Sequence, residues 1–218
     1  MKSKCTISAI IVESPTPPPP PFVGTKVRVR IPADSLAFEF YSISLDTAKE
    51  EGTIDWGDGS TEIVTTNGKR SHAYAEGGEY TIALADDFRR IKISDTSDDP
   101  YTQRYSETVL SIVSNASLWS AILPRSYQRC TNMAQLDISA SGVEKLTAGV
   151  FRDCPAVTGR IDLPNVAEIV GDEPQFVGCS GITEIHFAAK NEEAIRNSES
   201  FKVDPKLGAA NAVVFFDL

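Results

Sequence analysis

The chain has 218 residues, of which 41% are hydrophobic and 23% charged, a length that suits one or two domains with cores of their own. Asp and Glu total 30 against 21 Lys and Arg, so the formal net charge is -9. This acidity, without any long run of Lys and Arg, argues against nucleic-acid binding. No apolar run approaches the roughly 20 residues of a membrane-spanning helix, so we expect no membrane insertion.

Residues 1–23 are predicted to form an extended tail that ends in a proline run, Pro17–Pro21. Such a run adopts polyproline II and acts as a semi-rigid spacer. No signal-peptidase site follows residues 5–12, so the sequence does not indicate a secretion signal. This segment is too short to fold alone, and its composition favours strand addition to an exposed sheet edge on a protein partner. The predicted docking residues are Thr6, Ile7, Ile10, Ile11 and Val12.

Alternation of apolar and polar residues begins at Lys26 and continues to Ile93, which is the pattern of half-buried strands. Turn signals separate the alternating runs at residues 57–60, 67–68 and 77–78. Roughly seven short strands in about 70 residues, each closed by a turn, predict a small antiparallel sandwich.

Two blocks within this region resemble the polycystic-kidney-disease (PKD) domain family. The first is Ile-Asp-Trp-Gly-Asp-Gly-Ser at residues 54–60, and the second is the His-x-Tyr-x-x-x-Gly-x-Tyr run that begins at His72. Gly77-Gly78 stands where the family often has Pro-Gly. The resemblance covers about residues 24–96 and implies an immunoglobulin-like spacer or binding module that has no chemistry of its own.

A polar, acidic joint at residues 97–107 is predicted to separate this region from a repeat of longer period. In the repeat an aromatic anchor precedes a cysteine by three residues, and successive anchors are 24 and 25 residues apart. The three pairs are Tyr127 and Cys130, Phe151 and Cys154, and Phe176 and Cys179. Phe201 falls at the next repeat position, in a segment degenerate enough to be a terminal cap. Units of this length bury a core only by stacking.

The repeat resembles the BspA-like leucine-rich repeat of bacterial surface proteins, and its best copy is residues 163–185. This resemblance covers about residues 108–218 and implies a short leucine-rich-repeat solenoid. The predicted fold class is therefore mostly β: an immunoglobulin-like PKD β-sandwich followed by a short solenoid.

The chain offers few residues for catalysis or metal binding. The periodic cysteines predict a ladder of small buried side chains, and without a Cys-x-x-Cys pair a zinc site has no support. Asp55 and Asp58 flank a glycine-rich turn, and this pattern has two interpretations. The residues could bind a calcium ion, or Asp58 could cap its own turn, and we favour the second. His72 is expected in the core or on a sheet surface. No known catalytic motif occurs, so we predict no enzyme, no metal and no cofactor.

The middle residues of three strand-like triplets occupy equivalent places in the repeat, and they are Asp137, Asp162 and His186. Each lies between two apolar residues that would point inward. Alternation therefore places all three outward on one sheet face as a column. Two interpretations stay open: a solvated polar ladder, or the ligand-binding face of the solenoid.

The tail and the two modules predict a non-enzymatic display or attachment protein that is anchored through its tail in a larger assembly. Since no secretion signal is indicated, we favour a phage virion, with the protein on the virion surface as a capsid decoration, head fibre or tail component. The alternative, which both resemblances imply, is a bacterial cell-surface or extracellular adhesin that binds a host protein or glycan.

Overall fold

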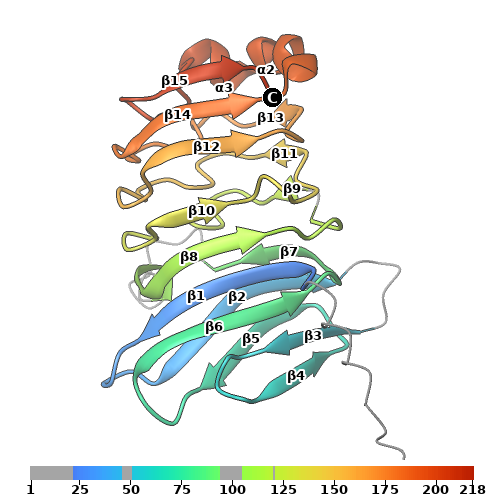
Figure 1. Ribbon diagram of the computed structural model, residues 1–218, viewed down its shortest axis with the longest axis vertical. Helices are drawn as coiled ribbons and strands as arrows, with labels where there is room; N and C mark the ends of the chain where they lie inside the picture. Colours follow the sequence, from blue (N-terminus) through green and yellow to red (C-terminus); the bar gives the residue numbers. More distant parts are fainter. Residues whose placement is uncertain (1–21, 46–50, 94–104, 120) are drawn as a thin grey trace, which may run out of the picture.

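The computed structural model describes residues 22–45, 51–93, 105–119 and 121–218. The predicted docking residues of the tail and most of the predicted acidic joint lie outside these ranges. The protein is mostly β and elongated, and a β-solenoid-like stretch of about 3 turns is stacked on a pair of facing sheets (Figure 1).

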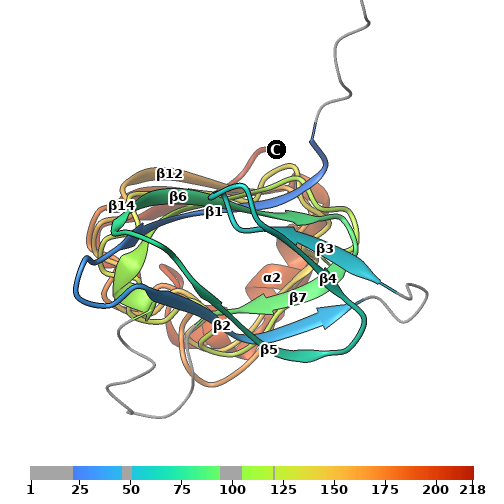
Figure 2. The ribbon, with the colours of Figure 1, turned by 90° about the horizontal axis from the view of Figure 1, so that it is seen from below.

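The paired sheets enclose the first part of the core (Figure 2). One contains, in spatial order, β1 (Gly24–Ile31), β6 (Gly78–Ala85), β3 (Gly52–Asp55) and β4 (Thr61–Val64). The other contains β5 (Gly68–Ala73), β2 (Ala37–Leu45) and β7 (Phe88–Lys92). In β1, Val27 and Val29 are fully buried whereas the basic residues between and beside them are exposed. The predicted alternation of short strands is therefore confirmed.

The glycine-rich turn between β3 and β4 is held by its own aspartates. Asp58 Oδ1 accepts a hydrogen bond from the Ser60 N–H at 3.0 Å, and Asp58 Oδ2 lies 2.7 Å from His72 Nε2. Hydrogen bonds from Ser60 and His72 hold the pKa of Asp58 well below its usual range. The His72 ring stacks on Trp56 at 4.8 Å between ring centroids, on the sheet surface as expected. The prediction that Asp58 caps its turn is confirmed.

The solenoid has two strand-bearing faces (Figure 1). The long strands are β8 (Val109–Ser114), β10 (Gln135–Asp137), β12 (Gly159–Leu163), β14 (Ile182–Phe187) and β15 (Val213–Phe216). The short parallel strands of the opposite face are β9 (Ala121–Ile122), β11 (Lys145–Leu146) and β13 (Glu168–Ile169). Between β14 and β15 come a 3-10 helix, η1 (Ala189–Asn191), and two short helices, α2 (Glu192–Asn197) and α3 (Glu199–Val203).

The aromatic anchors and cysteines form two internal ladders. The Tyr127 and Phe151 rings stack at 5.6 Å, and the Phe151 and Phe176 rings at 5.5 Å, both nearly parallel. The three cysteines, Cys130, Cys154 and Cys179, are free and buried. Cys179 donates its thiol hydrogen to the Phe151 carbonyl oxygen at 2.9 Å. The neighbouring Cys154 thiol, together with burial, raises the pKa of the Cys179 thiol, so the group stays an unreactive thiol. The predicted cysteine ladder is confirmed.

Phe201 does not continue the aromatic stack, although it falls at the right spacing. It lies in α3, where its ring packs against Phe216 at 6.1 Å. The last coil is closed by Leu207, whose carbonyl oxygen accepts a hydrogen bond from the Phe176 N–H at 2.7 Å. The helices inserted ahead of β15 lengthen this coil, so repeat spacing no longer identifies the residue at its corner.

The paired sheets and the coils share one sheet and one apolar core. β8 pairs antiparallel with β1 and parallel with β10, which gives a six-stranded sheet in the order β10-β8-β1-β6-β3-β4. On the other side of the core, Tyr127 donates its hydroxyl hydrogen to the Ile91 carbonyl oxygen at 3.0 Å. Tyr105 packs edge-on against Phe38. Buried apolar side chains therefore run continuously along the rod.

Candidate functional site

The side chains that point away from the core on the long strands form one surface along the rod, which we call the outward face. Cross-strand pairing aligns Lys26, Val113 and Asp137 in one row on β1, β8 and β10. In a second sheet, β12 and β14 pair with Asp162 opposite His186. The predicted column of Asp137, Asp162 and His186 is therefore divided between two paired rows, and Asp137 and Asp162 line one hollow between them.

Asp137 and Asp162 differ in what they contact. Asp137 is exposed, and its Oδ1 accepts hydrogen bonds from the Ser139 N–H at 3.1 Å and the Ser139 hydroxyl at 2.7 Å. Asp162 is half-buried, and its Oδ1 lies 2.6 Å from Arg160 Nε on the same strand. Each carboxylate thus uses one oxygen in a local contact.

His186 corrects the expectation of an exposed column. Its side chain lies on the outward side of β14 but is only 3% exposed. The Phe215 ring of β15 stacks on it at 4.4 Å, and two carboxylates flank its ring nitrogens. Nδ1 is 2.7 Å from Asp217 Oδ1, and Nε2 is 2.9 Å from Glu184 Oε2. Since β15 covers the ring, only Asp137 and Asp162 are accessible to a ligand.

The His186 contacts predict a pH-dependent stability. Burial lowers the pKa of His186, but the hydrogen bonds to Asp217 and Glu184 outweigh burial and the nearby Arg160 charge, so the pKa is raised. A raised folded-state pKa stabilises the fold below the unfolded-state pKa, and this contribution is lost as pH rises through the folded-state value. In urea denaturation from pH 5 to 9, we expect wild-type stability to fall relative to His186→Gln as pH rises. Parallel pH profiles for the two proteins would refute this role.

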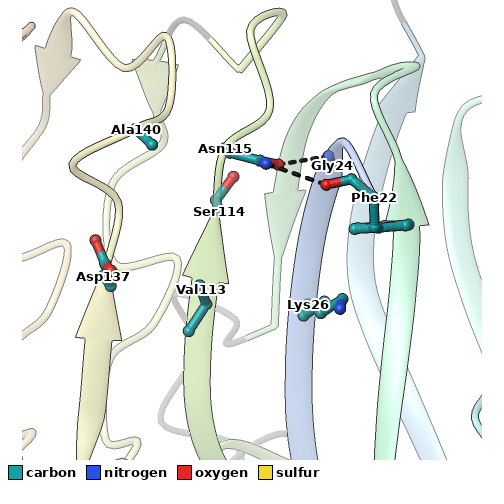
Figure 3. Close-up of a pocket in the computed structure, with 8 residues that line it drawn as sticks. All are labelled: Phe22, Gly24, Lys26, Val113, Ser114, Asn115, Asp137 and Ala140. Carbon is teal, nitrogen blue, oxygen red and sulfur yellow. Dashed lines mark hydrogen bonds between the residues drawn. The ribbon is translucent and has the colours of Figure 1, made fainter. Parts of the chain in front are cut away.

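Among the hollows of the outward face, two adjoin each other at Asp137. The first, which we call the tail-root hollow, has a volume of about 200 Å³ and lies where the described chain begins (Figure 3). Its apolar surface comes from Phe22 and Val113, and the Lys26 ammonium is 5.0 Å from the Phe22 ring centroid. Asn115 holds this start of the chain: its Oδ1 accepts from the Gly24 N–H at 2.8 Å, and its Nδ2 donates to the Phe22 carbonyl oxygen at 3.1 Å.

The second hollow, which we call the strand-gap hollow, has a volume of about 290 Å³ and lies between β10 and β12. β10 pairs with β8 and β12 pairs with β14, but no backbone ladder joins β10 to β12. Polar side chains dominate its lining, namely Gln135, Asp137, Ser139, Thr158, Arg160 and Asp162. Asp137 lines both hollows, so they adjoin.

Sequence reasoning identified Asp137 and Asp162 but missed Phe22, Lys26 and Asn115. Alternation marks Lys26 as exposed, yet no local signal brings it beside Val113, which is 87 residues away and reaches it only through the β1–β8 pairing. The predicted docking residues of the tail lie outside the described ranges. Within the described ranges, no group of three or more His, Cys, Asp or Glu side chains is placed to hold a metal ion.

The fold and the outward face define an elongated, mostly β protein with an extended polar surface. The chain matches no family model, and no curated protein or solved structure shows significant similarity to it. No helix in the described part of the chain is both long and apolar enough to span a membrane.

Proposed function

We propose that the protein is a non-enzymatic attachment protein whose N-terminal tail docks into a larger assembly while the rod presents its outward face. The assembly we propose is a phage virion, with the protein at its surface. The main support is the continuous core, since one sheet and one set of buried side chains join both parts into a single rod. A rod of this kind holds its surface at a set distance from its point of attachment.

The point of attachment supports the same proposal. The described chain begins at Phe22 on the flank of the rod, where two hydrogen bonds with the Asn115 side chain anchor it. Pro17–Pro21 precede this anchored start directly, and a proline run favours polyproline II. The tail thus joins the rod at Phe22, which is hydrogen-bonded to Asn115. Docking of the tail would therefore fix the position of the rod.

The proposal extends to the two parts of the rod. We assign the paired sheets to a PKD-like sandwich because of the glycine-rich turn and the stacking of His72 on Trp56. We assign the coils to BspA-like repeats because of the aromatic and cysteine ladders. Both assignments suit a protein that spaces and displays a binding surface.

Deleting residues 2–21 tests the docking tail. We expect full-length protein to co-sediment with phage particles in a density gradient, and the truncated protein to remain folded but at least about tenfold less abundant in the particle fraction, an affinity loss of about 1.4 kcal/mol or more. A matched control keeps the length of the tail and replaces Ile7, Ile10 and Ile11 with serine, which should reproduce the loss.

Normal incorporation of the truncated chain, or failure of that chain to fold, would refute the docking tail. Recovery of full-length protein with the bacterial cell surface in place of particles would favour the adhesin, which binds a host protein or glycan.

A further inference from the structure

The strand-gap hollow contains main-chain groups that need partners. One edge of β10 and one edge of β12 face it, and neither edge is paired in a ladder. Backbone N–H and C=O groups require hydrogen-bond partners when they are removed from bulk water. A ligand that fills this hollow must therefore offer both donors and acceptors at short intervals.

An inserted peptide strand does not fit the gap. β10 and β12 approach within 8 Å between Cα atoms. A strand between them would hold them about 9.6 Å apart, which is two strand spacings. The hollow suits small groups that act as donor and acceptor at once, and a hydroxyl group has that property.

The tail-root hollow adds one apolar side chain, Val113, with a polar group on each side. Val113 lies between Asp137 and Lys26 in one cross-strand row, and the Phe22 ring lies beyond Lys26 (Figure 3). Two strand spacings, about 10 Å, separate the backbones of Lys26 and Asp137. This distance accommodates a sugar ring, whose C–H face would lie on Val113 while hydroxyl groups at its edge reach Asp137 and Lys26. The Phe22 ring helps to position Lys26, whose ammonium lies 5.0 Å from the ring centroid.

Charge favours a neutral ligand. Asp137 belongs to both hollows, and Asp162 is paired with Arg160 at 2.6 Å. The chain as a whole carries a net charge of -9, which repels an acidic ligand. The remaining carboxylate oxygens accept hydrogen bonds from hydroxyl groups, which carry no charge of their own.

We infer that the two hollows form one site for a neutral oligosaccharide, with one sugar ring on Val113 in the tail-root hollow and the next at the mouth of the strand-gap hollow, into which only its hydroxyl groups reach. Asp137 lies at the junction and accepts hydrogen bonds from both rings. This inference rests on the proposed function, because it names the ligand class that the attachment protein presents its outward face to bind.

Binding of the purified full-length protein to an array of neutral and acidic oligosaccharides tests the inference. We expect binding to neutral oligosaccharides of two or more rings. In calorimetric titration with the strongest neutral glycan of the array, Asp137→Ala and Phe22→Ala should each weaken binding by about tenfold or more. Asp137→Asn should retain most of the affinity, because an amide oxygen still accepts hydrogen bonds from hydroxyl groups.

The controls use residues of the same type away from the site. Asp172→Ala removes an exposed carboxylate that lines neither hollow, and Tyr41→Ala removes a partly exposed aromatic ring from β2 in the other paired sheet. Both should bind like the wild type, and all variants should keep the wild-type circular dichroism spectrum. Binding to acidic oligosaccharides alone, equal affinity of Asp137→Ala, or no binding anywhere on the array would overturn the inference. The assay needs neither the tail nor a particle, so its failure is distinct from a failure of tail docking.

Discussion

Replacing Phe151 with alanine should lower the free energy of unfolding by about 3–5 kcal/mol, as expected for loss of a large buried aromatic side chain. Phe151 is fully buried and stacks between Tyr127 and Phe176. Because the coils share a core with the paired sheets, we expect the loss to affect the whole rod in one cooperative transition.

The two tryptophans report separately on the paired sheets and on the coils. Trp56 lies in the paired sheets and Trp119 in the first coil, and both are buried. Urea unfolding of Phe151→Ala, followed by fluorescence in Trp56→Phe and Trp119→Phe backgrounds, should shift the midpoint equally for both reporters. An unchanged Trp56 midpoint would show two independently folding modules. Ile63→Ala is the control, since Ile63 is 65% exposed and its loss should cost less than about 0.5 kcal/mol.

Replacing Gly142 with alanine should lower the free energy of unfolding by about 3 kcal/mol, the upper part of the range for an overpacked site. A Cβ at this position would lie 2.1 Å from the Ser117 carbonyl oxygen. The Gly142 N–H also donates to the Ala116 carbonyl oxygen at 2.9 Å. Successive coils contact through their backbones here, so relief of the clash must separate the coils.

Gly78 provides the matched control, because neither glycine has a positive φ. The nearest group to a Cβ at Gly78 would be the Tyr80 ring, at 3.6 Å, which is ordinary van der Waals contact. Gly78→Ala should change the free energy of unfolding by less than about 0.5 kcal/mol in the same urea titration. Equal effects of the two substitutions would show that the coils separate at no cost near Gly142.

The features that could be predicted from the sequence are those that recur at a fixed spacing along the chain. Alternation identified the strands of the paired sheets, and the regular spacing of the three aromatic–cysteine pairs predicted stacked coils with a ladder of buried cysteines. The same reasoning placed Asp137 and Asp162 outward on equivalent strands. These patterns can be recognised in the sequence because each strand or coil buries apolar side chains, and its geometry requires them at a fixed spacing.

Only the tertiary structure decided the features that depend on distant pairings or on a broken repeat. β1 pairs with β8 across nearly 90 residues, which joins the two parts into one sheet and brings Lys26 beside Val113. His186 is buried because Phe215 of the last strand stacks on it, and Phe201 leaves the ladder because helices precede that strand. The strand-gap hollow exists because β10 and β12 do not pair. A sequence specifies which face of an element is apolar, whereas which elements meet depends on packing free energies summed over the whole chain.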